Sequence, residues 1–173
     1  MTERPVTLLE PGTVRLERLL PGPIERVWAY ITEADKRARW LAGGHFDLRV
    51  GGRISLEFDN NNLSSDKNPP ARFKDSAKHT TGGVITRLDP PRLLAHTWTW
   101  ESGDTEVTYE LTPRGKDVLL VIVHRRVPEQ AGVSVMSGWD VHSGILADVL
   151  NGVEPRPLWS TIEQLEKQYA AAL

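Results

Sequence analysis

Apolar and polar residues alternate along several stretches of the chain, and this pattern predicts the strands of an antiparallel sheet. The alternation begins in residues 13–20 and returns in residues 46–50 and 54–58. It resumes near residue 84 and recurs, between turns, up to residue 127. Successive side chains of a strand point to opposite faces, so each stretch has one face suited to burial. The pattern predicts about seven strands, separated by turns that contain glycine and proline.

Other stretches repeat their apolar residues every three to four positions, which predicts helices. Residues 24–31 place four large apolar side chains on one face of a short helix, and a second short helix closes at Trp40. A longer stripe runs from about Ser134 and ends before Gly152, which predicts a helix of about four turns. The final residues, 158–169, repeat the same spacing and predict a last helix.

Residues 59–80 interrupt this regular pattern with Asn, Ser, Asp, Lys and Pro. Such a composition predicts a long exposed loop. A loop of this length within a compact domain is either a solvated insertion or a functional element such as a lid over a binding site. Leu63 and Phe73 are its large apolar residues and would anchor such a lid.

The chain has the length and composition of one globular domain. It has 173 residues, of which 39% are hydrophobic and 25% charged, with a net charge of −2. Lys and Arg are dispersed, so we expect neither nucleic acid nor an anionic membrane surface as a partner. No apolar run approaches the ~20 residues that span a bilayer. Residues 1–12 lack the pattern of a secretory signal, and the chain has no cysteine, so a cytoplasmic protein is expected.

Several short motifs carry a family resemblance. They are Pro23 with Val27-Trp28, Ile31-Thr32, Trp40, residues 47–52 (DLRVGG), residues 90–93 (PPRL), Thr97-Trp98 and Gly138-Trp139. In order and spacing, over residues 12–152, the chain resembles bacterial domains related to the activator of the heat-shock-protein-90 ATPase. That family belongs to the START-related, helix-grip superfamily, which also contains polyketide cyclases and the birch-pollen allergen.

This resemblance implies an α+β helix-grip fold. We therefore expect a curved antiparallel sheet of about seven strands, wrapped around a long C-terminal helix, with two short helices after the first strand. Residues 1–152 would form this START-like domain. Residues 153–173 would be a helical extension that packs either on the same domain or on a partner subunit. Trp159 in the extension makes a homodimer a second expectation.

A curved sheet that grips one helix leaves a cavity between the two, and this cavity is the candidate site. By strand parity and the helix stripe, the residues expected to line it are His96, Trp98, Trp100, Val107, Tyr109, Leu120, Ile122, His124, Trp139, His142 and Leu146. Aromatic walls with a few polar tips suit a flat, mostly apolar small molecule. The alternative for each aromatic residue is plain core packing, and for each histidine a hydrogen-bonded core position.

Signatures of catalysis and of metal binding are weak in this sequence. The histidines, at positions 45, 79, 96, 124 and 142, form no pair at metal-ligand spacing. No G-x-S-x-G segment or cysteine offers a nucleophile. We therefore predict no metal and no cofactor, and assign no catalytic residues. Acid–base chemistry would need only one or two cavity groups, such as His124 or His96 with Tyr109.

The function predicted from the sequence is binding of a small hydrophobic or aromatic ligand in the cavity, with no assigned reaction. Two alternatives remain open at this point. One is a cyclase/aromatase-like or hydrolase-like enzyme that uses a cavity histidine or tyrosine as acid–base. The other is a chaperone-associated regulatory protein, which the name of the resembled family suggests.

Overall fold

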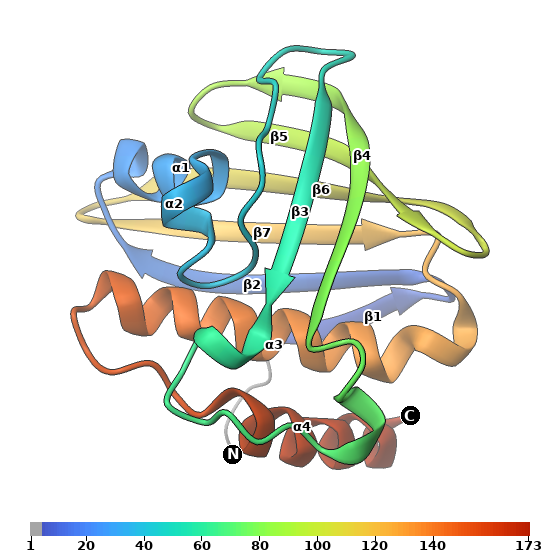
Figure 1. Cartoon of the computed structure of the whole chain (residues 1–173). Coiled ribbons are helices and arrows are strands. Elements are labelled where there is room, and N and C mark those ends of the chain that lie inside the picture. The colour runs from blue at the N-terminus through green and yellow to red at the C-terminus, as the bar shows by residue number, and fades with distance from the viewer. Residues whose placement is uncertain (1–4) are drawn as a thin grey trace.

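The computed structural model describes residues 5–173; residues 1–4, at the start of the predicted domain, lie outside the described residues. Its helices and strands are, in chain order, β1 (Val6–Glu10), β2 (Thr13–Pro21), α1 (Ile24–Thr32), α2 (Ala34–Arg37), β3 (Arg53–Asp59), β4 (Lys78–Asp89), β5 (Leu93–Trp100), β6 (Gly103–Arg114), β7 (Asp117–Arg125), α3 (Gly132–Leu150) and α4 (Leu158–Ala172). Short 3-10 turns occur at Asn60–Asn62, Ala71–Phe73 and Glu129–Ala131. Figure 1 shows their arrangement.

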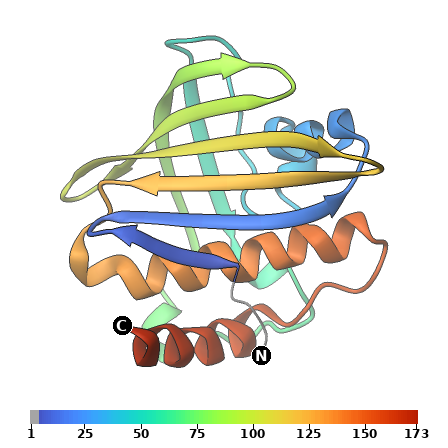
Figure 2. The same ribbon diagram turned by 180° about the vertical axis from the view of Figure 1, so that it is seen from behind.

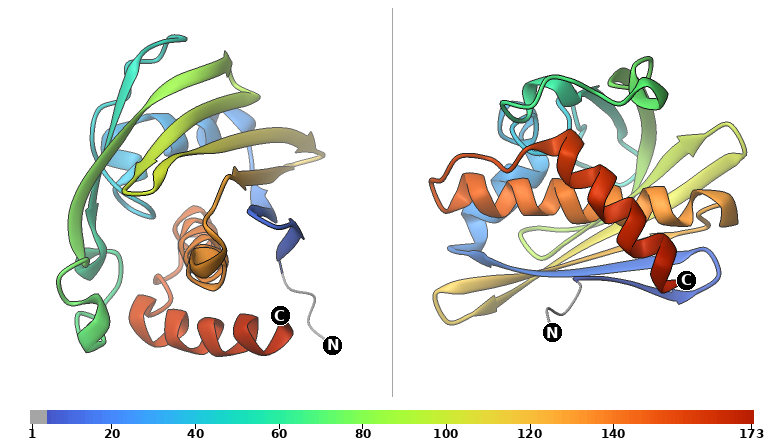
Figure 3. Two further views of the ribbon diagram at one scale, coloured as in Figure 1. Left: turned by 90° about the vertical axis from the view of Figure 1, so that its right-hand side faces the viewer. Right: turned by 90° about the horizontal axis from the view of Figure 1, so that it is seen from below.

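All strands join one antiparallel sheet in the order β1-β2-β7-β6-β5-β4-β3. The sheet curves, and α3 lies along its concave face (Figures 1 and 2). Seen nearly along its axis, α3 has the sheet on one side and α4 on the other (Figure 3, left). This arrangement confirms the predicted helix-grip fold.

Every second side chain of the central strands faces α3, and these side chains form the core between the sheet and that helix. In β7 the residues that face α3 are Val118, Leu120, Ile122 and His124, and all four are buried. The same parity buries Val107, Tyr109 and Leu111 in β6, because paired strands expose the same face of the sheet at opposed positions. The apolar stripe of α3 packs onto this surface.

The ends of the sheet differ from the sequence prediction in two places. The prediction of a strand at residues 46–50 is wrong. The Arg49 and Gly52 amides donate to the carbonyls of Asp47 and Arg49, both at 2.8 Å, so this segment turns and contacts β3 only through isolated bridges. Conversely, β1 was not predicted, because only Val6 of its five residues is buried and alternation is absent.

Strand β4 changes partners halfway along its length, and this opens the sheet beside α3. Residues 78–84 pair with β3, whereas residues 85–89 pair with β5. At the crossing, Gly83 lies so close to the Thr97 carbonyl that a Cβ atom there would collide with it. Glycine is therefore needed for this close approach. Beyond the pair Ile85–His96 the backbone ladder between β4 and β5 ends. Side-chain hydrogen bonds replace it there, from the Val84 amide to the Thr97 hydroxyl at 2.9 Å and from the Thr81 hydroxyl to the Thr99 carbonyl at 3.0 Å.

A buried arginine organises the segment between α2 and β3. The Arg37 guanidinium donates to the Ala42 carbonyl at 2.9 Å, to the Ile31 carbonyl at 3.1 Å, and to the carbonyls of Thr32 and Gly44. It also packs 3.6 Å from the centre of the Phe46 ring. Burial lowers its pKa to about 10, so the side chain remains charged at neutral pH. One side chain thus fixes four backbone carbonyls of an irregular segment.

The C-terminal extension packs on the outer face of α3 within the same chain. Leu158, Trp159, Ile162 and Tyr169 of α4 are buried. Tyr169 donates a 2.7 Å hydrogen bond to Asp140 on α3, and the other carboxylate oxygen of Asp140 pairs with Arg18 of β2 at 3.0 Å. The apolar stripe that suggested a dimer is therefore used inside the chain. None of the helices formed by residues 5–173 has the length and apolar character needed to traverse a bilayer.

Candidate functional site

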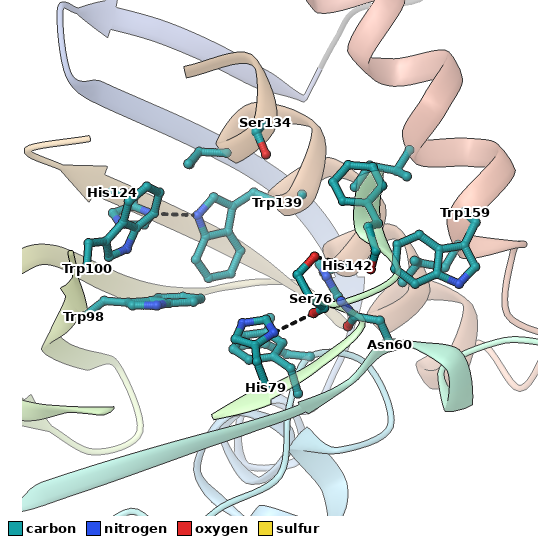
Figure 4. Close-up of a pocket in the computed structure, with 17 residues that line it drawn as sticks. Asn60, Ser76, His79, Trp98, Trp100, His124, Ser134, Trp139, His142 and Trp159 are labelled. Carbon is teal, nitrogen blue, oxygen red and sulfur yellow. Dashed lines mark hydrogen bonds between the residues drawn. The ribbon is translucent and has the colours of Figure 1, made fainter. Parts of the chain in front are cut away.

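A pocket of about 220 Å³ lies where β4 leaves β5, between the open part of the sheet, α3, α4 and the segment 60–77. Figure 4 shows the side chains that border it. They are Leu41, Phe58, Asn60, Phe73, Ser76, His79, Trp98, Trp100, His124, Ser134, Val135, Gly138, Trp139, His142, Leu158, Trp159 and Ile162. Among the described residues that line the pocket, none is Asp, Glu, Lys or Arg.

Aromatic rings form most of the pocket wall. The indole of Trp98 stacks on Phe58, with 5.6 Å between ring centroids, and meets Trp139 edge-on at 6.0 Å. Trp100 and Trp159 bring the number of indoles at the wall to four. Trp98 and Trp100 reach the pocket because alternation along β5 places both side chains on the same face of the strand as His96. Trp139 projects from the sheet-facing stripe of α3.

His124 is fixed by hydrogen bonds on both ring nitrogens. The Trp139 indole N–H donates to its Nδ1 at 3.1 Å, so that nitrogen carries no proton. Its Nε2–H therefore donates to the Thr105 hydroxyl at 2.7 Å, and this hydroxyl in turn donates to the Trp98 carbonyl. Burial lowers the pKa of His124 to about 3. The ring is neutral at physiological pH, and neither nitrogen is available to a ligand.

His96 and Tyr109 form a second closed pair beneath the pocket. The Nδ1–H of His96 donates to the Thr97 carbonyl at 2.8 Å, and the Tyr109 hydroxyl donates to its Nε2 at 2.9 Å. Both side chains are buried. Burial lowers the pKa of His96 to about 4 and raises the pKa of Tyr109. A closed, dry pair of this kind cannot exchange a proton with a molecule in the pocket.

His142 is arranged differently, because one of its ring nitrogens has no partner. Its Nδ1–H donates to the Trp40 carbonyl at 2.8 Å. Trp40 itself is held by its indole N–H, which donates to the Tyr30 carbonyl at 2.7 Å. Burial lowers the pKa of His142 to about 4, so the ring is neutral and its Nε2 carries a lone pair. No residue between 5 and 173 makes a hydrogen bond to that nitrogen.

The segment 60–77 is docked on α4 by several polar contacts. The Trp159 indole donates to the Asn61 side chain at 2.9 Å, and the Leu158 amide donates to the Ser64 hydroxyl at 3.0 Å. Arg72 pairs with Glu166 at 2.9 Å. Leu63 is buried, and the Phe73 ring stacks on the Trp159 ring at 5.7 Å, at the pocket wall. The two apolar residues of the segment thus lie against the protein, and the segment and α4 together cover one side of the pocket.

The eleven residues predicted from the sequence separate into two groups. Trp98, Trp100, His124, Trp139 and His142 border the pocket. The remainder lie in the core and do not border it; they are His96, Val107, Tyr109, Leu120, Ile122 and Leu146. The physical reason is that α3 packs closely on the central strands, so the concave face is filled there and open only where β4 diverges. A role in ligand binding stays a prediction for all eleven.

Sequence reasoning offered residues 59–80 as a possible lid but named none of them among the residues that line the cavity, and it did not place α4 at the site. Both contribute to the pocket wall, through Asn60, Phe73, Ser76, Leu158, Trp159 and Ile162. The available signal was the isolated Phe73 in a polar stretch, together with the apolar stripe of the last helix. Either feature requires a partner surface, but the sequence does not say which one.

Metal-ligating side chains do not cluster in the described part of the chain. Within residues 5–173, no group of three or more His, Cys, Asp or Glu side chains is placed to hold a metal ion. Two polar atoms at the pocket, Asn60 Oδ1 and Trp100 Nε1, are buried and have no hydrogen-bond partner among the described residues. The pocket therefore offers aromatic surface and a few polar tips.

Fold and site together define a helix-grip α+β domain with an aromatic pocket beside its long helix. The chain belongs to the family of Activator of Hsp90 ATPase homolog 1-like proteins, whose family model matches residues 21–151. This confirms the resemblance identified from the sequence. A comparison with curated proteins gave no significant match.

Several solved structures share this fold along most of the chain. A protein from Bordetella parapertussis, solved by NMR, is 39% identical over 96% of this chain and 89% of its own, with a TM-score of 0.81. The crystal structure of CalU16 from Micromonospora echinospora is 25% identical over 92% of this chain and 86% of its own, with a TM-score of 0.69. A protein from Chromobacterium violaceum is 27% identical over 81% of this chain and 98% of its own, with a TM-score of 0.65.

Proposed function

We propose that this protein binds one small, uncharged, largely aromatic molecule in the pocket between β3–β5, α3 and α4. The observation that carries the proposal is the pocket wall, which has four indole rings and no charged side chain. Aromatic side chains bury a large area at low entropic cost, and a charged ligand would lose its hydration here without gaining an ionic partner. A flat, neutral molecule is the ligand that such a wall favours.

The hydrogen bonding of His124 and His96 favours binding over acid–base catalysis by these two residues. His124 and His96 were the residues expected to act in an enzyme, and each has both ring nitrogens occupied. A general acid or base must reach the proton it transfers and needs a pKa near the working pH. Neither histidine meets these requirements. The docked apolar face of α4 likewise leaves no apolar stripe on that helix for a chaperone to bind.

We also propose that residues 153–173 belong to the binding domain, because they form part of the pocket wall. The segment 60–77 and α4 would then act together as the cover of the bound ligand. In this proposal the ligand enters where Phe73 and Trp159 stack, since these two rings join the cover's two elements at the pocket.

Titration with the neutral fluorophore N-phenyl-1-naphthylamine tests the proposal. We expect saturable binding of one molecule per chain. Replacing Trp98 by Ala removes a stacking surface, and the expected loss of affinity is about tenfold or more, equivalent to about 1.4 kcal/mol. Trp28→Phe is the matched control, because Trp28 lies on α1 and does not border the pocket.

Native mass spectrometry of the same protein measures the stoichiometry and reveals any molecule that copurifies. Linear uptake of the fluorophore without saturation would contradict the proposal. Equal affinities in wild type, Trp98→Ala and Trp28→Phe would show that the dye binds somewhere other than this pocket, and would contradict it as well.

A further inference from the structure

The histidines at the pocket differ in burial and in how many of their ring nitrogens are hydrogen-bonded to other residues. His124 has a partner on each ring nitrogen. His79 is exposed and uses only its Nδ1, which donates to the Ser76 carbonyl at 2.6 Å. His142 keeps an unpartnered Nε2 while being almost fully buried. In the view of Figure 4, His142 lies with Asn60 and Ser76 on one side of the pocket, opposite Trp98 and Trp100.

The chemical character of His142 Nε2 is determined by its surroundings. The Trp40 carbonyl can only accept a hydrogen bond, so the proton of the neutral imidazole resides on Nδ1. The helix α3 fixes the position of the His142 ring, and the Trp40 carbonyl, in the segment after α2, fixes its tautomer. Nε2 is consequently an acceptor and cannot donate. Burial keeps the ring neutral, which preserves this state at physiological pH.

Asn60 lies on the same side of the pocket and carries an acceptor of a different kind. Its side-chain oxygen is buried and has no hydrogen-bond donor among the described residues. Its backbone amide donates to the Ala77 carbonyl at 2.8 Å, which fixes the residue at the start of the segment 60–77. Protein atoms cover the Asn60 side-chain oxygen, so of the two acceptors without donors only His142 Nε2 is open to a ligand.

We infer that His142 is a specificity-determining residue, which selects ligands that present an O–H or N–H donor to its Nε2. The inference rests on the proposed function, since it concerns a molecule bound in the same pocket. A hydrocarbon or an ether that filled the pocket would displace water from Nε2 and leave that acceptor unpaired. Unpaired buried acceptors are costly, and the expected discrimination against such a ligand is about tenfold. The ligand class is thus a neutral aromatic molecule with a hydroxyl or amine hydrogen at one end.

Two probes of closely similar shape test the inference, 2-naphthol and 2-methoxynaphthalene. The first has a donor and the second has none. Affinities are measured by isothermal titration calorimetry for wild type, His142→Asn and His142→Gln. The Asn amide can still donate to the Trp40 carbonyl but offers no acceptor at the position of Nε2, whereas the longer Gln side chain places an amide oxygen near it.

The expected result is a preference for 2-naphthol that is about tenfold greater in wild type than in His142→Asn, with His142→Gln retaining part of it. Comparing the ratio of affinities between variants removes the different hydration of the two probes. In wild-type protein, the ¹⁵N resonance of His142 Nε2 should shift on addition of 2-naphthol and remain in place with 2-methoxynaphthalene. This second measurement needs no variant, so it holds even if His142→Asn fails to fold.

The possible outcomes separate the inference from the proposed function. If both probes bind with the same ratio in wild type and His142→Asn, and the Nε2 resonance does not respond, the inference is overturned while ligand binding stands. If neither probe nor N-phenyl-1-naphthylamine binds at all, the proposed function fails and the inference falls with it. A shifted resonance together with the wild-type preference supports both.

Discussion

Acidification should unfold this protein at an unusually high pH, because three buried histidines are neutral in the folded state. The pKa of His96 and of His142 is lowered to about 4, and that of His124 to about 3, in each case chiefly by burial. The ordinary value, 6.5, applies to the unfolded chain. Between these values the unfolded chain binds protons that the folded protein excludes, so the free energy of unfolding falls as the pH falls.

The magnitude follows from the same numbers. The contribution of each histidine is complete above about pH 7 and is lost progressively as the pH drops from 6.5 towards the folded pKa. At pH 5 each histidine has lost about 2 kcal/mol, at about 1.4 kcal/mol per unit of pH, and the three together about 6 kcal/mol. Domains of this size are stable by about 5–15 kcal/mol, so the loss is a large part of the total.

Urea unfolding, followed by tryptophan fluorescence at pH 7.5, 6.5, 5.5 and 5.0, measures this dependence. We expect a slope of about 4 kcal/mol per pH unit near pH 5.5, reduced by about a third in His124→Gln. The carboxylates with lowered pKa, Glu17 and Asp148, act at lower pH and do not obscure this window. NMR titration of the folded protein is an independent check. An imidazole resonance of His96, His124 or His142 that titrates near pH 6.5, or a free energy of unfolding that is constant from pH 7.5 to 5.0, would refute the reasoning.

Two further predictions concern side chains that hold the scaffold. Arg37→Lys should lower the free energy of unfolding by about 2–4 kcal/mol, because an ammonium cannot reach all the carbonyls that the guanidinium fork satisfies. Urea unfolding measures this loss, and Arg39→Lys, at an exposed arginine, is the control. Equal stability of the two variants would contradict the prediction. Tyr169→Phe removes the hydrogen bond to Asp140 and should lower the free energy of unfolding by about 1–2 kcal/mol. Hydrogen exchange of the α4 amides should accelerate in that variant, and unchanged exchange would show that the bond does not hold the helix.

Much of the fold could be predicted from the sequence because the spacing of apolar residues along each segment identifies most of the strands and helices. In β7 alternate residues are buried, and alternation marks the buried face directly. The apolar stripe of α3 likewise marks its sheet-facing side, although α4 also covers the opposite side of that helix. The strand predicted at residues 46–50 was wrong, because the alternation there does not come from pairing in the sheet. Residues 46–50 alternate, but their backbone groups turn on themselves, and Arg37 rather than a sheet ladder fixes the neighbouring chain.

The site was less predictable because it depends on contacts between distant segments. Parity placed His96 and His124 on the inner face of the sheet, yet nothing local indicates that Tyr109, Thr105 and Trp139 occupy their nitrogens. The position of the opening depends on the bend at Gly83, where β4 exchanges one neighbour for another. Most of residues 60–77 are polar, which predicts an exposed loop. Only a few of their side chains dock on α4, and the composition of the segment does not reveal those contacts.

The helix α4 has an evolutionary consequence, because it lies outside residues 21–151 and still supplies Leu158, Trp159 and Ile162 to the pocket wall. It is attached by side-chain contacts on the outer face of α3, and Asp140 links its Tyr169 to Arg18 of β2. Substitutions in this helix can therefore change the shape of the binding surface without altering the strands. The same residues belong to the hydrophobic core, so a change of ligand range through α4 also changes the stability of the fold.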